Sequence, residues 1–360
     1  MTSRTGLAVR TAARRTLAAS SSPVGVHGPG PEGERVADHV QLHRPCRRSR
    51  RPLPAHPGRA VLTLAGEPRK DRSAAHSTVS GVCHGTLGEL YQGPLRAGTA
   101  PDIALVSFPV DRHAWVHFTR GTGPPDLSRL GKKSATAARL FLDHFELTLP
   151  PGLWSTHSDL RVGVGMASST ADIVATLRCL FQLFSVPYDE GLVLTILAAI
   201  ERADSVFLDE FALHLSGRHR VIRRLGTAFG FHTAFVTEPG TVDTEAVTTS
   251  LLEHYRRRGE EYELCLTDLL KGFDSGDPAA VARAATTSAA LSQEVLPKAH
   301  FHDLLSHRER FGADGLFVAH TGCLIGYLFP RRLDAHRKSE LSAFFRSLGY
   351  QCSFVQGGYG

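Results

Sequence analysis

One segment organises the sequence: Gly163-Val164-Gly165-Met166-Ala167-Ser168-Ser169-Thr170-Ala171-Asp172. A β-like run at 159–162 precedes it, and an apolar run with helical periodicity follows it. We therefore expect it to join a strand to a helix. Gly163 and Gly165 permit a bend that side chains would obstruct. Because the first turn of a helix carries unpaired N–H groups and partial positive charge, the segment predicts a phosphate-binding loop.

Three hydroxyl groups at the start of this helix add to the interpretation. Ser168, Ser169 and Thr170 are suited to contact a phosphate oxygen or a bound Mg²⁺. A helix capped by Ser or Thr after a glycine turn fits the same residues equally well, so local chemistry leaves both open. The segment is not a Walker A loop, since no Gly-Lys-Ser/Thr follows, and it lacks the third glycine of the dinucleotide fingerprint.

Residues 165–170 resemble the Gly-Leu-Gly-Ser-Ser-Ala loop of the GHMP small-molecule kinases, and Gly-Met-Ala-Ser-Ser-Thr-Ala-Asp is more similar to the L-threonine kinase branch of that superfamily. The resemblance implies ATP and Mg²⁺ as cofactors. It assigns nucleotide binding to Gly163, Gly165, Met166, Ala167, Ser168, Ser169, Thr170 and Gly322. It also implies that Ser168 or Ser169 helps to hold Mg²⁺ together with Glu201.

A second motif lies at 79–93, which resembles Gly-x-Cys-Gly-Glu-Leu-x-Gln-Gly with Leu87 where that motif has Cys. We expect a short strand that bends at two glycines. The resemblance implies that Glu89 and Gln92 line the active site and contact the acceptor. Without it, a hairpin turn with solvated side chains is the default interpretation.

An acidic segment follows a helix expected from about Asp189 to Ala203. Glu201-Arg202-Ala203-Asp204 resembles the Glu-Pro-Thr-Asp segment of the family, with Arg-Ala replacing Pro-Thr. Because phosphoryl transfer to an alcohol needs an oriented hydroxyl, Asp204 is the candidate to position or deprotonate the acceptor. Solvated acids at a helix end are the alternative.

Two further carboxylates, Asp209 and Glu210, are nearby rivals for the roles assigned to Glu201 and Asp204.

The third motif, Ala319-His320-Thr321-Gly322-Cys323, resembles Ala-His-Ser-Gly-Thr. There Gly322 would let a turn approach the phosphate loop and Thr321 keeps a hydroxyl for the substrate. Cys323 removes the hydroxyl of the family's Thr. Alone, this stretch would be a plain hairpin.

Charge is distributed unevenly along the 360 residues. Residues 1–78 hold 14 Lys/Arg and 5 Asp/Glu, a net charge of +9, whereas 79–360 hold 27 and 30, a net charge of −3. This argues against nucleic-acid binding by the folded body. The Arg-, Pro- and Gly-rich tail predicts disorder. It is open to interpretation as a transit peptide, a nucleic-acid-binding arm or a non-functional extension, and the last is favoured.

The remaining pattern predicts an α+β protein with an N-terminal domain at 79–230 and a C-terminal domain at 231–360. Helices are expected at 134–146, 189–203, 244–258, 260–273, 278–295, 302–310 and 333–347, and strands at 102–110, 114–118, 231–237, 315–319, 323–329 and 352–355. The resemblance implies the two-domain GHMP kinase fold, in which the first domain is like domain 2 of ribosomal protein S5 and the second is ferredoxin-like.

Six scattered cysteines without a CxxC pair argue against a zinc site and fit a reducing cytosol. The sequence has no apolar run of about 18 residues, so no membrane span is expected.

The resemblance implies a cytoplasmic kinase, monomeric or homodimeric, that converts L-threonine to O-phospho-L-threonine for the cobalamin linker. Another alcohol such as homoserine, serine or a specialised metabolite is the first alternative. A catalytically inactive nucleotide-binding relative is the second, and a nucleic-acid binder acting through the basic tail is the third.

Overall fold

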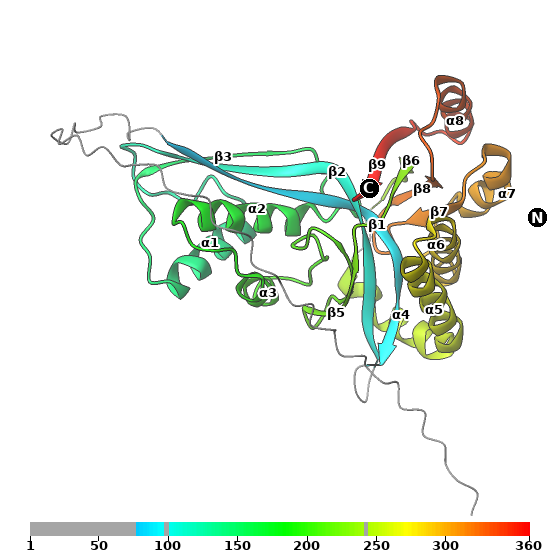
Figure 1. The fold of residues 1–360 in the computed structure, drawn as a ribbon, viewed down its shortest axis with the longest axis horizontal. Helices are drawn as coiled ribbons and strands as arrows, with labels where there is room; N and C mark the ends of the chain where they lie inside the picture. Colours follow the sequence, from blue (N-terminus) through cyan, green and yellow to red (C-terminus); the bar gives the residue numbers. More distant parts are fainter. Residues whose placement is uncertain (1–76, 97–100, 241–243) are drawn as a thin grey trace, which may run out of the picture. The chain divides into compact units, whose positions relative to one another are not determined.

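The computed structural model describes residues 77–96, 101–240 and 244–360, which belong to one compact unit beginning near Pro68. The expectations for the tail at 1–78 thus fall almost wholly outside the described residues. Within the described part, nine strands form one sheet that carries eight helices (Figure 1). The expected α+β class is confirmed.

Two long antiparallel strands, β1 (Thr78–Arg96) and β2 (Pro101–Arg120), run through the N-terminal half. The expectation of a short strand bending at two glycines was wrong, as was the division of β2 into two strands. Pairing between β1 and β2 continues along both strands, and register shifts near Gly85 and Glu89 take up the bends as bulges.

The rest of the N-terminal half places three helices and three further strands around this pair. Their bounds are α1 (Lys132–His144), β3 (Gly152–Ser158), α2 (Ser168–Leu183), α3 (Glu190–Ala198), β4 (Phe211–Leu215) and β5 (Arg220–Gly226). Sequence analysis did not predict β3, β4 or β5. It also placed a strand at 159–162, which is wrong because β3 ends at Ser158.

Two helix boundaries differ from expectation. Helix α1 begins at Lys132 after Gly131, so Ser134 is not its N-cap. Helix α3 ends at Ala198 rather than Ala203, and the acidic segment therefore lies in a loop beyond the helix. This loop frees the backbone to direct consecutive side chains to different neighbours.

The C-terminal half follows a β-α-β-β-α-β order with extra helices after the first strand. Strands β6 (Gly230–Thr237), β7 (Gly315–Val318), β8 (Leu324–Phe329) and β9 (Ser353–Gly358) pair antiparallel in the order β9-β6-β8-β7. This is the expected ferredoxin-like arrangement.

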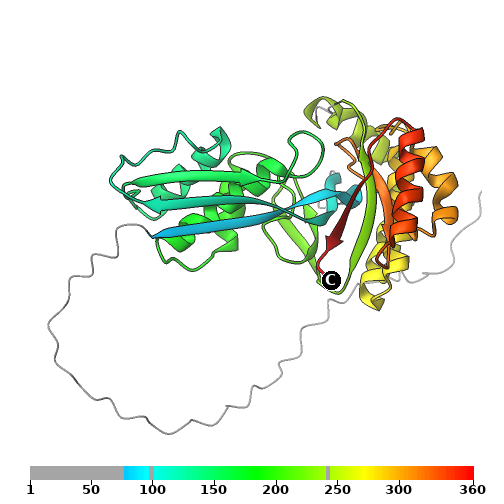
Figure 2. The ribbon, with the colours of Figure 1, turned by 90° about the horizontal axis from the view of Figure 1, so that it is seen from above.

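The helices of this half lie close to their predicted positions, and Figure 2 shows the orange and red ones stacked against one side of the strands. Their bounds are α4 (Thr244–Arg257), α5 (Gly259–Ser275), α6 (Pro278–Ser292), α7 (Phe301–Phe311) and α8 (Ala335–Ser347). Asp277 caps α6 through its side chain, with Pro278 at the first helical position.

Close packing of α2 on β1 fixes where the N-terminus of α2 lies. A Cβ at Gly81 would come within 1.9 Å of the Ala175 carbonyl oxygen, so the helix touches the strand only because glycine stands there. Apolar side chains of α2, including Ile173, Leu177 and Leu180, are fully buried.

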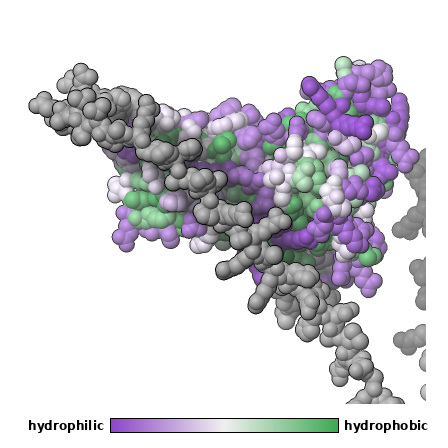
Figure 3. Space-filling view, viewed as in Figure 1, coloured by the Kyte–Doolittle hydropathy of each residue, from purple (hydrophilic) through white to green (hydrophobic). Residues whose placement is uncertain are grey.

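The surface of the molecule that faces the viewer in Figure 3 is mostly polar, with smaller apolar patches. Of the helices described, none has the length and apolar character needed to cross a membrane.

Candidate active site

The segment before α2 is a tight turn that leaves the helix N-terminus without a side-chain cap. Gly163 and Gly165 have φ of +78° and +95°, and Ala167 occupies the left-handed region at +53°. Ala167 is also the N-cap residue, and no side chain bonds to the first turn from that position. The alternative of a Ser/Thr-capped helix is therefore excluded. The partial positive charge of this end is available to an anion.

Strand β1 holds this loop from one side. The Thr86 amide donates to the Met166 carbonyl oxygen at 3.1 Å, and the Gly88 amide donates to that of Gly165 at 3.0 Å. Because both bonds use loop carbonyls, the loop amides are not consumed by this contact. The Met166 side chain is buried and anchors the turn to the core.

The turn between β7 and β8 holds the loop from the other side. The Cys323 amide donates to the Val164 carbonyl oxygen at 2.9 Å. A Cβ at Gly322 would lie 2.5 Å from that same oxygen, and one at Gly165 would lie 2.4 Å from the Ala319 Cβ. Glycine is thus required on both sides of this contact. The Cys323 thiol donates to the Gly240 carbonyl oxygen at 2.9 Å, so it has a polar partner of its own.

Glu201 lies beside the first turn of α2. Its two oxygens accept hydrogen bonds from Ser169 Oγ and Thr170 Oγ1, both at 2.8 Å, and Lys133 Nζ also contacts it. Burial, together with the Glu201 charge, raises the pKa of Asp172 to about 6. Hydroxyl and carboxylate oxygens of this kind suit Mg²⁺, which is commonly held by one or two carboxylates and by substrate phosphates.

Among the predicted metal ligands, Ser169 and Glu201 are brought together, while Ser168 is buried at the start of the helix. In the described part of the chain, no group of three or more His, Cys, Asp or Glu residues is arranged to hold a metal ion.

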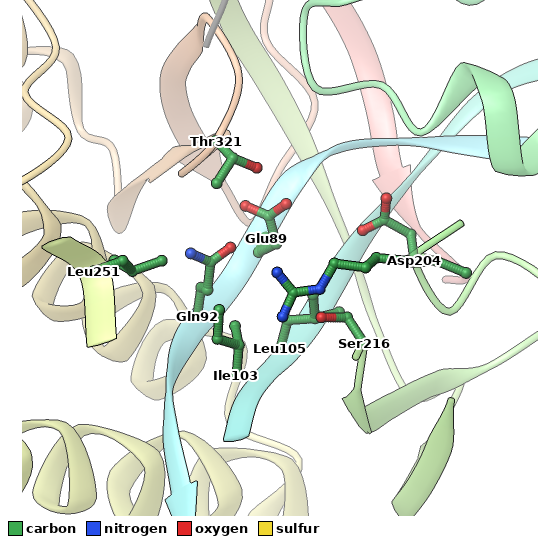
Figure 4. Close-up of a pocket in the computed structure, with 10 residues that line it drawn as sticks. Glu89, Gln92, Ile103, Leu105, Asp204, Ser216, Leu251 and Thr321 are labelled. Carbon is green, nitrogen blue, oxygen red and sulfur yellow. The ribbon is translucent and has the colours of Figure 1, made fainter. Parts of the chain in front are cut away.

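Asp204, three residues after Glu201, lines a cavity of about 140 Å³. Figure 4 shows its carboxylate and that of Glu89 in the same cavity, with Thr321 near Glu89. The other side chains that line the cavity are those of Gln92, Ile103, Leu105, Arg202, Ala203, Ser216 and Leu251. This volume is below the roughly 300 Å³ at which pockets for drug-sized ligands begin, so the cavity suits a small metabolite.

The pKa of Asp204 is raised to about 7. Burial is the main cause, and the Glu89 and Glu201 carboxylates add to it, while the Ser107 hydroxyl, which donates to Asp204 Oδ1 at 3.2 Å, opposes it. A carboxylate poised near neutral pH is well placed to accept a proton.

A buried hydrogen-bond network fixes the opposite wall. Glu89 Oε2 accepts from both the backbone amide and Nδ1 of His320, at 2.9 and 3.0 Å. His320 Nε2 bonds to Ser288 Oγ at 3.1 Å, and the Gln92 amide donates to the same hydroxyl at 3.2 Å. The side-chain amide of Gln92 donates to Tyr255 at 3.2 Å. Neither Glu89 nor Gln92 is the solvated turn residue of the alternative interpretation.

A buried lysine binds the backbone of the turn between β7 and β8. Lys298 Nζ donates to the carbonyl oxygens of His320 and Gly322, at 3.3 and 2.8 Å. Burial lowers its pKa. The lysine therefore stabilises the turn that contacts both the loop and the cavity.

The rival carboxylates lie outside this cavity. Asp209 pairs with Arg178 at 3.0 Å, and Glu210 pairs with Arg224. Sequence analysis did not assign Lys133, His320 or Arg202 to the site. For His320 and Arg202 a signal existed, since both stand inside motifs that were recognised. For Lys133 the sequence favoured a solvated turn over a phosphate contact, because its contact with Glu201 depends on where α1 packs.

Comparisons with known proteins agree with this geometry. Residues 132–212 match the family model described as the N-terminal domain of GHMP kinases. The chain is 28% identical to an L-threonine kinase of Salmonella typhimurium over 69% of this chain and 82% of that one, and 28% identical to that of Citrobacter freundii over 69% and 85%.

Solved structures show the same fold at low sequence identity. A homoserine kinase from Cytophaga hutchinsonii matches with a TM-score of 0.57 at 14% identity, over 82% of this chain and 96% of that one. A phosphomevalonate kinase from Streptococcus pneumoniae gives 0.58 at 11%, over 79% and 99%. With the three motifs gathered around one loop and one cavity, this chain has the GHMP kinase fold, and its residues 132–212 match the N-terminal domain of that superfamily.

Proposed function

We propose that this chain transfers the γ-phosphoryl group of ATP to the side-chain hydroxyl of free L-threonine, giving O-phospho-L-threonine. One observation carries the proposal. Glu201 bonds to the first turn of α2, whereas Asp204, three residues later, lines the cavity. A single short loop thus joins a phosphate-binding helix end to an acceptor pocket. The L-threonine kinases matched over most of their length supply the choice of substrate.

In this proposal the α2 N-terminus receives the phosphates. Amides of the first turn and the hydroxyls of Ser168 and Ser169 bind phosphate oxygens, because the Ala167 N-cap leaves that end open. Ser169 and Glu201 would hold Mg²⁺, which when bound would neutralise charge on the phosphates. Lys133, which contacts Glu201, adds positive charge at the same place.

Asp204 acts on the acceptor. Its pKa of about 7 lets it accept a proton at neutral pH, and Ser107 fixes its orientation. Glu89, Gln92 and Thr321 line the same cavity and position the substrate. The reaction requires the acceptor hydroxyl to lie between Asp204 and the phosphate at α2, which the shared loop allows.

The test is turnover by the full chain with Mg·ATP and a panel of L-threonine, L-serine, L-homoserine and a simple alcohol. ADP release and the mass of the phosphorylated product are measured. Asp204→Ala is the inactivating variant, and Asp209→Ala, which lies outside the cavity, is the matched control. Preferential phosphorylation of L-threonine, lost only in Asp204→Ala, supports the proposal.

The other outcomes each contradict a different part. Turnover on another alcohol alone overturns the substrate and retains the kinase. ATP binding without any turnover overturns the activity and favours an inactive nucleotide-binding relative. Absence of ATP binding overturns the assignment of the loop at 163–170.

A further inference from the structure

The cavity contains one positively charged side chain among the described residues that line it, that of Arg202. It stands between Glu201 and Asp204, where the family pattern has proline. We propose that Arg202 binds a carboxylate of the acceptor and thereby selects an α-amino acid over a neutral alcohol. This inference rests on the proposed kinase function and specifies how its substrate is recognised.

The charges around the cavity match those of a hydroxylated amino acid. Glu89 and Asp204 present two carboxylates, and the Glu89 charge adds to the burial that raises the pKa of Asp204. Arg202 supplies the opposite charge. An acceptor with a carboxylate, an ammonium group and a hydroxyl thus finds a partner for each: Arg202, Glu89 and Asp204 in turn.

The Glu89 carboxylate is already ordered for such a role. Both bonds from His320 end on Oε2, and the group faces the cavity near Thr321 (Figure 4). An ammonium group there would offset the repulsion between Glu89 and Asp204. It would lower the pKa of Asp204 and favour its ionised, proton-accepting form.

The guanidinium of Arg202 lies close to the backbone at Gly217. A Cβ at Gly217 would lie 3.1 Å from Nη2 and 3.5 Å from Nε of Arg202, so the absence of a side chain there allows this close approach at the edge of the cavity. The neighbouring Ser216 lines the cavity with its hydroxyl (Figure 4). Guanidinium matches carboxylate geometry through two parallel hydrogen bonds, which an ammonium group does not reproduce.

The hydrocarbon part of the acceptor also has a partner surface. Ile103, Leu105 and Leu251 form an apolar side of the cavity. Such a pocket, mostly apolar with a few converging polar groups, is typical of small-molecule sites. A short aliphatic amino acid fits this distribution better than a sugar or a polyol.

The experiment compares L-threonine with L-threoninamide, which keeps the size, the ammonium group and the hydroxyl but replaces the carboxylate with a neutral amide. Steady-state kcat and KM are measured for the wild type, Arg202→Ala and Arg202→Lys. Arg223→Ala is the matched control, since this exposed arginine pairs with Asp274 and does not line the cavity.

We expect Arg202→Ala to lower kcat/KM for L-threonine by about 10- to 100-fold, mainly through KM, because a charge-assisted contact is lost. The value for L-threoninamide should change by less than about threefold, so the preference of the wild type for the acid disappears. Arg202→Lys should restore only part of it. An equal loss on both substrates, or no loss on either, would overturn the inference.

A binding arm separates this failure from failure of the kinase proposal. If no acceptor is phosphorylated, L-threonine and L-threoninamide are titrated calorimetrically into the chain with Mg²⁺ and a non-hydrolysable ATP analogue. Threonine binding that is stronger than amide binding and depends on Arg202 supports the inference even without turnover. Binding that does not depend on Arg202, or no binding, contradicts it.

Discussion

In the proposed site, the nucleotide side and the acceptor side are built in different ways. The nucleotide side consists of the loop and first helical turn at 163–170 with Glu201 against them. The acceptor side is the cavity, whose lining comes from β1, β2, the loop after α3, the end of β4, α4 and the turn after β7. One is nearly contiguous in sequence, and the other draws on segments spread over most of the folded unit.

The difference follows from what each side must recognise. Phosphates are bound by backbone amides and a helix dipole, which a short local turn provides. A small acceptor is distinguished by side chains placed around it, and these have to be collected from separate elements. Phosphate binding is therefore expected to tolerate changes in the cavity, while acceptor binding depends on the packing of the whole unit.

The turn at 319–323 is where the two sides meet. Gly322 packs against the loop carbonyl of Val164, whereas His320 and Thr321 face the acceptor side through Glu89 and the cavity. Substitutions on either side of this turn are therefore expected to separate nucleotide effects from acceptor effects.

The largest effect is expected for Asp204→Asn. Removing the proton-accepting carboxylate should lower kcat by about 10²- to 10⁴-fold while the Kd for ATP changes little. Steady-state kinetics and nucleotide titration measure the two sides separately. Asp209→Asn, outside the cavity, should leave both unchanged. An equal loss of ATP affinity would show that the two sides are not separable.

The next largest effect is expected for Gly322→Ala. Its Cβ would lie 2.5 Å from the Val164 oxygen and 2.7 Å from the Gly165 Cα, so the turn or the loop has to move. We expect a loss of about 1–3 kcal/mol in the free energy of unfolding and weaker ATP binding. Denaturant unfolding and ATP titration test this. Gly259→Ala is the control, because its Cβ would enter open space.

A smaller effect, confined to the acceptor side, is expected for His320→Ala. It removes the Nδ1 donor to the buried Glu89 and should cost about 1–3 kcal/mol of stability. The KM for the acceptor should rise more than that for ATP. Adding Glu89→Gln removes the buried charge, so the double variant should lose less than the sum of the single losses. Strict additivity would argue that the two residues are not coupled.

The last expected effect is a pH-dependent gain in stability on removing the Asp204 charge. Burial raises the pKa of this group from 3.8 to about 7, so its ionisation disfavours the folded state increasingly between these values. The Asp204→Asn variant should therefore match the wild type near pH 4 and exceed its melting temperature by a few degrees above pH 7. A constant difference across this range would contradict the raised pKa.

Several parts of this architecture follow from sequence patterns alone. The helical period after Ser168, the Asp277-Pro278 cap and the alternation of strands and helices in the C-terminal half predicted the elements found there. Predictions failed where long-range pairing decided the outcome. The β1–β2 pair absorbs glycine bends as bulges, and the strands β4 and β5 have no strong local signal.

The sequence by itself determined the glycine turn before α2, the motif order and the fold class, because these depend on glycine freedom, helical periodicity and residues close together in the chain. Only the tertiary structure decided which carboxylates share the cavity. In the folded chain Asp204 and Arg202 line the cavity, whereas Asp209 pairs with Arg178 outside it. Burial and electrostatic coupling of this kind arise only when distant segments pack together, so no local pattern encodes them.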